Sequence, residues 1–568
     1  MMLNAYSILK FRVSEFSSRK SIDDTYKSTP SRILTMIEIT IFFGLLALIL
    51  VLVVIAEKIS IPYPILLVIA GLGVAFIPGT PSVRLDPELV FLVFLPPLLF
   101  HAAWFTSWPD FVRYRRPISI LAIWLVLATT SCVAIVAHYL IPGFSWPIAF
   151  ALGAIVSPPD AVAAAAILGK MRIPRRLVTI LEGESLVNDA TGLIALKYAL
   201  LVLATGSFFF WHAAGNFVLV ALGGLAVGLG FSIAIRHLHR FIRATPTVEI
   251  VLSILAALFA YFIAETLHVS GVLAVVSSGL YLSAKSSELL SPQTRLLGKA
   301  FWEVLIFIIN GIVFLLIGLQ LKEILHNLSG YSITTLILYG LIISLSVILV
   351  RIVWVVPGAL MPNLLGTKHT KKDRPNWRSA LVVGWSGMRG VVSLAAAMAL
   401  PLTLADGSVF AQRDLMLFLT FFVIFITLVV QGLTLPFLIR KLKIEDEDIA
   451  EKESSQIHLI LADGAIEHIA TLKKKGIIDA TTFERLIDEY QHKINFFKGN
   501  LGEDKNEESE SFVRQHHEAE ESSLEYQRKL LLDLKRKGSM HDDALREVEN
   551  YLDLEESRIT TEHAHKRH

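Results

Sequence analysis

Long apolar stretches recur between residues 36 and 439, and they decide which class of fold this chain can adopt. A helix needs about 20 mostly apolar residues to cross the hydrocarbon core of a bilayer. Thirteen stretches approach or exceed that length, and 54% of all residues are hydrophobic whereas 18% are charged. The sequence therefore predicts an all-α polytopic membrane protein with about 13 transmembrane helices. The predicted spans are 36–56, 62–78, 88–105, 117–141, 146–169, 177–204, 214–236, 247–265, 269–284, 300–321, 331–360, 379–401 and 411–439.

The basic residues of the loops alternate with the predicted spans. If the N-terminus lies outside, the cytoplasmic loops carry clusters such as those at 113–116 and 368–378. The opposite loops carry only Arg84, Lys322 and Arg413. Because cytoplasmic loops of membrane proteins are enriched in Lys and Arg, this alternation supports the number of spans. It predicts a multi-pass protein of the cell (inner) membrane with a cytoplasmic C-terminal tail.

Composition divides the chain into three parts. Residues 1–35 form a polar, basic leader, residues 36–440 a transmembrane domain, and residues 441–568 a charged tail with helical apolar spacing. A basic leader outside the cell conflicts with the positive-inside pattern. We interpret Met36 as the biological start and the leader as absent from the mature protein. A genuine disordered leader that begins at Met1 is the alternative.

The tail is predicted to form a small helical regulatory domain. It holds nine of the 17 histidines, and histidine titrates near neutral pH. Two interpretations stay open, a tail that senses pH and a tail with ordinary solvated histidines. The net charge of +2 gives no indication of a nucleic-acid partner.

The stretch EGESLVNDATG, residues 182–192, places ionisable groups inside the sixth predicted span. Such groups cost several kcal/mol at bilayer depth and are rarely found there without a role. On a helix, Glu182, Ser185 and Asp189 share one face, and Glu184 and Asn188 share the neighbouring face. A hydroxyl one turn from a carboxylate offers two oxygen ligands to a hard cation such as sodium.

A proton competes with a cation for the same carboxylate oxygen. Burial raises the pKa of carboxyl groups in general, which brings this competition toward neutral pH. Asp189 would then hold either a proton or a cation, and a transporter that reorients only when Asp189 is occupied would exchange one for the other. The alternative is that the polar groups only form hydrogen bonds between helices.

The fifth span is interrupted by SPPD, residues 157–160. Pro158 and Pro159 each remove a backbone donor and clash with the preceding turn. Irregular backbone at membrane depth is tolerated where it is buried or lines a cavity. The freed carbonyls could bind a cation, and Asp160 could neutralise the N–H groups at the start of a half-helix. A simple proline kink is the alternative, but it leaves Asp160 unexplained.

The twelfth span carries a second interruption, GWSGMRG at residues 384–390. Two interrupted spans, one in each half of the chain, indicate a transport site in a carrier built from repeats. Arg389 in this span and Arg351 in the eleventh cannot be deprotonated, so each needs either an acidic partner or the end of a helix dipole. Glu184 and Glu303 are the candidate partners, with a structural role as charge pairs, and the sequence leaves the pairing open.

These segments together resemble a known family. GES followed by VNDATGLIA, together with SPPDAVA, FWEVLIF, WSGMRGVVS and FLPPLLFHAAW, is similar to the NhaP/NHE-type sodium/proton antiporters of the first cation:proton antiporter family. The similarity covers residues of about 36 to 440. It implies 13 helices, two crossed broken helices, inverted repeats and a homodimer built on the first helices. It also implies an elevator-type movement of one domain against the other.

The resemblance assigns roles to individual residues. Asn188 and Asp189 correspond to the family's Asn–Asp pair, which implies electroneutral exchange with Asp189 as the ion carrier. It also implies that Ser185 is a cation ligand and that Asp160 is the aspartate of the broken helix. The metal bound by Asp189 and Ser185 would be a transported monovalent cation, Na⁺ or Li⁺, and no cofactor is expected.

Two departures from the family pattern concern the ion preference. Relatives commonly have Thr-Asp-Pro in the broken helix, whereas Pro159 precedes Asp160 here, so a hydroxyl is lost and the Pro159 carbonyl remains as a possible ligand. Many relatives carry an acidic residue at the position of His101. His101 is either a modulator of pH dependence or a helix-packing residue.

Three other functions are compatible with parts of the sequence. A K⁺/H⁺ antiporter would use the same oxygen ligands. An intramembrane protease is suggested by the G-x-S-G pattern at residues 384–387 together with Asp160 and Asp189, but this pattern arises readily in glycine-rich spans. A sensor that no longer transports is opposed by the intact Asp189.

Overall fold

The computed structural model is helical throughout the part that it describes. In that part the only β pairing is an isolated antiparallel bridge between Thr403 and Val409. The described residues are 29–59, 61–77, 90–169, 171, 173–206, 210–241, 245–328, 330–364, 376–404, 407–444, 449–501, 507–537, 545, 548–549 and 551–557.

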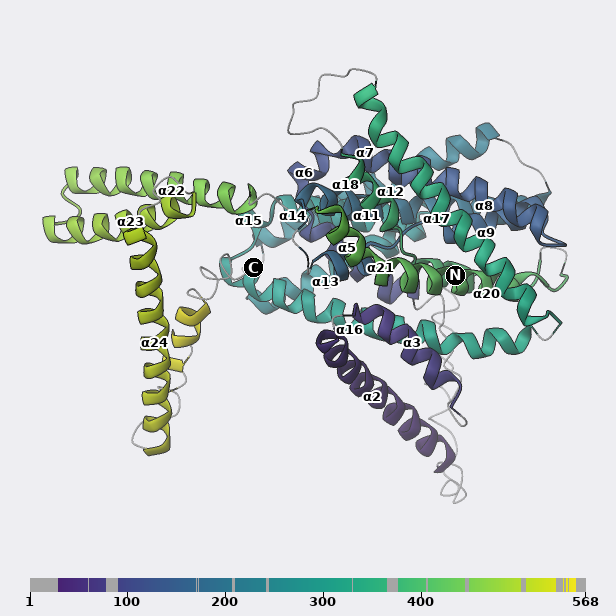
Figure 1. Ribbon diagram of the computed structural model, residues 1–568, viewed down its shortest axis with the longest axis horizontal. Coiled ribbons are helices and arrows are strands. Elements are labelled where there is room, and N and C mark those ends of the chain that lie inside the picture. The colour runs from purple at the N-terminus through teal and green to yellow at the C-terminus, as the bar shows by residue number, and fades with distance from the viewer. Residues whose placement is uncertain are drawn as a thin grey trace. The chain divides into compact units, whose positions relative to one another are not determined.

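The chain divides into two compact units, Met1–Glu445 and Asp446–His568. Most helices of the first unit are labelled in Figure 1. They are α2 (Thr29–Lys58), α3 (Tyr63–Ala75), η2 (Val90–Phe94), α5 (Leu95–Phe105), α6 (Trp108–Arg113), α7 (Arg115–Ser119), η3 (Ile120–Leu125), α8 (Val126–Leu140), α9 (Trp146–Val156), α10 (Ala161–Leu168), α11 (Arg175–Thr205), α12 (Phe210–Phe241), α13 (Pro246–Thr266), α14 (Gly271–Ala284), α15 (Ser286–Leu289), α16 (Pro292–Asn327), α17 (Ile333–Leu364), α18 (Trp377–Trp385), α19 (Val391–Met398), α20 (Arg413–Ile426), η5 (Thr427–Gln431) and α21 (Gly432–Leu442).

The helices confirm an all-α polytopic membrane protein, and each of the thirteen predicted spans contains helix. Within the described residues, seven helices are long and apolar enough to cross a bilayer, and four shorter ones are apolar. The exact number of crossings stays a prediction. The seven are Arg115–Leu140, Arg175–Thr205, Ala214–His239, Pro246–Thr266, Pro292–His326, Ile333–Leu360 and Arg413–Leu442, and the four are Tyr63–Ala75, Val90–Phe105, Trp146–Val156 and Gly271–Ala284.

Small residues let the helices of the first unit pack closely. Gly71 of α3 lies against the backbone of α16 at Leu315, and Gly318 of α16 lies against the backbone of α3 at Val68. A side chain at either glycine would overlap that backbone. Because apolar burial does not drive helix association in lipid, such close backbone contact is a main source of stability for membrane helices.

Both predicted interruptions are present, and they meet. The first lies between α9 and α10, at Ser157 to Asp160, and the second lies between α18 and α19, at Ser386 to Gly390. The backbone N–H of Asp160 donates to the Met388 carbonyl at 2.7 Å. One break thus satisfies a backbone group of the other, as irregular backbone inside a membrane protein must do. The inverted repeat and the homodimer stay predictions.

The second unit consists of α22 (Ile449–Lys474), α23 (Ala480–Leu501) and α24 (Glu507–Lys537), followed by a short helix at residues 551–557. Helices α22 and α23 lie side by side (Figure 1). The Lys473 ammonium lies over the Phe483 ring, 3.9 Å from its centroid. The guanidinium of Arg528 on α24 binds Asp553 at 2.6 Å.

The predicted leader lies mostly outside the described residues, which begin at residue 29. Helix α2 begins at Thr29 and so includes the last residues of the predicted leader and Met36. The choice between Met1 and Met36 as the start stays a prediction.

Candidate functional site

Helix α11 presents the central polar residues of EGESLVNDATG to the interior. The side chains of Glu184, Asn188 and Asp189 are buried, and Asp189 is 6% exposed. Gly192, less than one turn beyond Asp189, brings α11 against the first break. A Cβ there would overlap the Pro158 ring and lie 3.2 Å from the Ala154 carbonyl oxygen. The absence of a side chain at residue 192 therefore sets how closely the acidic helix approaches the broken one.

Asn188 links α11 to the first break directly. Its Nδ2 donates to the Pro159 carbonyl at 2.8 Å. Its Oδ1 is buried and accepts no hydrogen bond from any residue that the structure describes. A buried acceptor without a donor costs about 1–3 kcal/mol. That oxygen is consequently available to a ligand that enters the site.

Asp160 lies between the starts of two half-helices. It is the N-cap of α10, where its Oδ1 accepts from the Val162 N–H at 2.8 Å. Its carboxylate also lies against Gly390 and accepts from the backbone of Val391 at the start of α19. A side chain at Gly390 would overlap that carboxylate. Because the N-terminus of a helix carries partial positive charge, Asp160 has two such partners.

Arg389 donates hydrogen bonds at the C-terminal ends of the half-helices, opposite to the N-terminal ends that Asp160 contacts. Its Nε donates to the Val156 carbonyl at 2.9 Å and its Nη2 to the Ser157 carbonyl at 3.1 Å. These are carbonyls at the C-terminal end of α9, which has no intrahelical donors for them. Its Nη1 donates to the Gly387 carbonyl. Among the described residues Arg389 thus binds the carbonyl ends of helices, which is the helix-dipole alternative, and its role in a charge pair with a glutamate stays a prediction.

Glu184 and Arg351 form the one buried ion pair of the expected set. The two guanidinium nitrogens lie 2.5 and 2.8 Å from the two carboxylate oxygens, and both side chains are 1% exposed. The Nε of Arg351 donates to the Val383 carbonyl of α18 at 3.2 Å. The pair thus connects α11, α17 and α18 near both breaks.

Glu303 does not belong to this set. Its side chain is 59% exposed, and its carboxylate lies 3.9 Å from the Lys299 ammonium one turn earlier on α16. The expectation that it is a buried partner for an arginine is wrong, because Glu303 faces outward from the helix bundle. An apolar sequence around a glutamate does not reveal which way the side chain points.

Ser185 and His101 occupy different surroundings. Ser185 is half-buried on α11, one turn before Asp189, and its role as a ligand stays a prediction.

His101 on α5 lies among aromatic rings. The centroid of its ring is 4.7 Å from that of Phe105 and 6.4 Å from that of Trp302. This environment is that of a packing residue, and a modulating role for His101 stays a prediction.

Sequence reasoning missed three polar residues. The Tyr63 hydroxyl forms a hydrogen bond with Asn310 and lies close enough to Asp160 to interact with it electrostatically. Gln431 is fully buried, and its amide has no partner among the described residues. Asn310 and Gln431 each stand alone in an apolar run, and that isolation was the available signal.

The site combines acidic oxygens, a backbone carbonyl and an amide oxygen around the two breaks. Asp189 lies close enough to Asp160 for their charges to interact. The two nearby arginines are engaged with Glu184 and with carbonyls, so neither supplies a fixed counter-ion to Asp189. Oxygen ligands without a fixed positive charge suit a proton or a hard cation.

The protease interpretation finds no support in this geometry. The hydroxyl of Ser386 is buried and donates to the Val382 and Val383 carbonyls at 2.8 and 3.3 Å. A nucleophile instead requires a base within hydrogen-bonding reach.

Comparison with known proteins gives a consistent result. The family described as "Sodium/hydrogen exchanger, transmembrane" matches residues 44–441. The chain is 36% identical over 399 residues to the "Sodium, potassium, lithium and rubidium/H(+) antiporter" of Bacillus pumilus, covering 69% of this chain and 59% of that protein. The "Na(+)/H(+) antiporter ApNhaP" of Aphanothece halophytica is 36% identical over 417 residues, covering 72% and 75% of the two chains.

A solved structure shares the fold. The sodium proton antiporter MjNhaP1 from Methanocaldococcus jannaschii superposes with a TM-score of 0.58 at 22% identity, covering 72% of this chain and 99% of that one. The chain spans 59% of the length of the Bacillus pumilus relative.

Proposed function

Because the chain belongs to the sodium/hydrogen exchanger family, whose members are transporters rather than enzymes, we propose that it is a secondary active antiporter of the cell membrane. It exchanges Na⁺ or Li⁺ for H⁺ and uses no cofactor. The proposal rests first on one observation, the meeting of the two helix breaks beside Asn188 and Asp189.

Asp189 is proposed to bind the cation and the proton in turn. Asp160 is already balanced by two half-helix starts, and Glu184 by Arg351. That leaves Asp189 as the carboxylate without a fixed positive partner. One negative charge that takes either one monovalent cation or one proton gives electroneutral exchange. Ser185, the Asn188 amide oxygen and the Pro159 carbonyl are the proposed additional ligands.

The movement is proposed to be of the elevator type. The contacts of Asp160, Arg389 and the Glu184–Arg351 pair join α9, α10, α11, α17, α18 and α19. Helices tied by buried polar bonds tend to move as one body. A homodimer built on the first helices is proposed from the family resemblance alone, since the exposed Leu50, Val51 and Val54 of α2 resemble the lipid-facing residues of other spans.

Potassium is the alternative cation. The name of the Bacillus pumilus relative includes potassium and rubidium beside sodium and lithium. The same oxygen ligands serve all four ions, so a broad cation range is the second candidate.

The test is cation-induced collapse of a preset pH gradient in everted vesicles that lack native antiporters. Na⁺, Li⁺ and K⁺ are added separately to the wild type and to Asp189→Asn. Collapse by Na⁺ and Li⁺ that disappears in the variant supports the proposal, and equal collapse by K⁺ favours the alternative cation. A folded wild-type protein that is inert with every cation, or a fully active Asp189→Asn, contradicts antiport through Asp189.

A further inference from the structure

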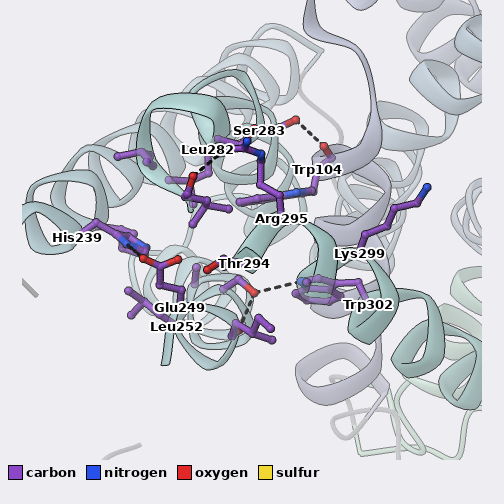
Figure 2. Close-up of a pocket in the computed structure, with 18 of the residues that line it drawn as sticks. Trp104, His239, Glu249, Leu252, Leu282, Ser283, Thr294, Arg295, Lys299 and Trp302 are labelled. Carbon is purple, nitrogen blue, oxygen red and sulfur yellow. Dashed lines mark hydrogen bonds and ion pairs between the residues drawn. The ribbon is translucent and has the colours of Figure 1, made fainter. Parts of the chain in front are cut away.

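A separate cavity of about 280 Å³ lies among α5, α12, α13, α14 and α16 (Figure 2). Its volume is near the lower limit for pockets that bind small molecules. None of its described lining residues belongs to either helix break. The helix ends that form it adjoin the loops that the positive-inside pattern assigns to the cytoplasmic face. The cavity therefore falls at the level of lipid headgroups.

One end of the cavity is acidic. Glu249, on the first turn of α13, is 10% exposed, and its Oε1 lies 3.9 Å from Nδ1 of His239. Its Oε2 is buried and has no hydrogen-bond partner among the described residues. Two other polar side chains of the walls have local partners. Trp302 donates to Ser253 at 3.1 Å and Ser283 to the Trp104 carbonyl at 2.5 Å. Oε2 of Glu249 is thus an acceptor without a donor among the described residues.

The rim of the cavity is basic. Arg295 and Lys299, one turn apart on α16, line it and are exposed. Arg295 uses Nη1 to donate to the Leu290 carbonyl at 2.8 Å, which leaves further N–H groups of its five. Figure 2 shows Glu249 and Arg295 on different sides of the cavity. One compartment therefore offers a carboxylate acceptor and a guanidinium donor set.

The surroundings of the rim are apolar. Leu296 and Leu297, which follow Arg295 on α16, are 73% and 56% exposed. Trp104 and Trp302 line the cavity, and tryptophan is enriched at membrane interfaces. An occupant held at the charged groups could extend an apolar part along α16.

We propose that this cavity binds the headgroup of an aminophospholipid, a phosphoethanolamine with its acyl chains against α16. The primary ammonium donates to the Glu249 carboxylate, and the phosphate accepts from Arg295, with Lys299 nearby. A primary ammonium has three donors, whereas the quaternary ammonium of a choline headgroup has none. The site therefore distinguishes the two headgroups, and its occupation does not depend on transport.

The test uses the full-length protein, purified and delipidated in detergent. Phosphatidylethanolamine, phosphatidylcholine and phosphatidylglycerol with identical acyl chains are titrated, and bound lipid is counted by native mass spectrometry beside thermal stability. We expect about tenfold tighter binding of phosphatidylethanolamine than of phosphatidylcholine, since a hydrogen bond to a charged group is worth about that factor. Glu249→Gln should abolish the preference, and Arg295→Gln should weaken binding of both phosphatidylethanolamine and phosphatidylglycerol.

Glu57→Gln, at an exposed glutamate near the end of α2, is the matched control and should keep the preference. Gly298→Leu is a second variant that removes no charge. A Cβ at Gly298 would have its nearest neighbour, Ile250, at 3.8 Å, so this lining position has room for a side chain, and leucine is chosen to occupy cavity volume. It should lose the lipid while remaining folded.

Three results overturn the proposal. They are equal binding of the ethanolamine and choline lipids by the wild type, a preference that survives in Glu249→Gln, and a preference that survives in Gly298→Leu. Glycerophosphoethanolamine is the soluble competitor. If it stabilises the protein as strongly as the lipid at equal concentration, with the same dependence on Glu249, the assignment to a lipid is wrong.

Discussion

Arg351 of α17 and Glu184 of α11 lie 167 residues apart and form a two-pronged ion pair whose side chains are each 1% exposed. Removing one member of such a pair leaves a buried charge uncompensated, which costs about 3–5 kcal/mol. Glu184→Ala should therefore lower the unfolding free energy by about that amount, measured by denaturant titration in mixed micelles.

The double variant Glu184→Met with Arg351→Met should recover most of the lost stability, because apolar residues of similar volume often replace a buried pair without loss. Glu303→Gln is the control. Its carboxylate is exposed and 3.9 Å from Lys299, so we expect a change within about 0.5 kcal/mol. A single variant as stable as the wild type would contradict the role of the pair.

Gly390 should be required for transport, whereas Gly384 should not. A methyl group at Gly390 would overlap the Asp160 carboxylate, but at Gly384 its nearest neighbour would be an Ile352 atom at 3.5 Å, an ordinary contact. Gly390→Ala should displace Asp160 from the two half-helix starts and abolish cation-dependent collapse of the pH gradient. Gly384→Ala should transport normally. If Gly390→Ala transports as fast as Gly384→Ala and the wild type, the position of Asp160 does not matter for transport.

Arg389→Lys should reduce transport by about tenfold or more. Lysine keeps the charge but lacks the planar set of donors that reaches the Val156 and Ser157 carbonyls, and a buried carbonyl without a donor costs about 1–3 kcal/mol. Arg413 provides the control, since it binds the Met398 and Leu400 carbonyls at 3.0 Å at the opposite end of α19. Initial rates in vesicles should fall for Arg389→Lys and change little for Arg413→Lys.

The start of α23 in the second unit should depend on pH through Asp479. Its carboxylate accepts from the Thr482 side chain and backbone, the latter at 2.8 Å, and these bonds lower the pKa of Asp479. A lowered pKa in the folded state means that the stabilisation is complete above the ordinary pKa and disappears as pH falls through the folded-state pKa. Hydrogen exchange of the first α23 amides, corrected for intrinsic rates, should accelerate on acidification. Asp479→Asn should remove that pH dependence, and unchanged acceleration in the variant would refute it.

Much of the architecture was predictable because it depends on residues that act locally. Pro158 and Pro159 cannot continue a helix, so the first break follows from the sequence itself. Helical periodicity predicts which polar residues share a helix face with Asn188 and with Asp189. Apolar length alone located the helices, although it does not fix how many cross the membrane.

The partners across the fold were not predictable. Arg389 binds carbonyls, and every residue has one, so nothing in the sequence marks Val156 or Ser157 as its partners. Glu184 and Glu303 looked equivalent in apolar surroundings, and only the packing of α11 and α16 buries one and exposes the other. The bond from Asn188 to the Pro159 carbonyl likewise requires the two helices to be in place.

The central claim is that Asp189 exchanges its proton for a cation. The most direct measurement is proton release on addition of Na⁺ to the purified protein in weakly buffered solution, followed with a pH-sensitive dye. The wild type should release close to one proton per protomer as Na⁺ saturates, and Asp189→Asn should release none. Saturable Na⁺ binding by the wild type without proton release, or release that persists in Asp189→Asn, would contradict the account.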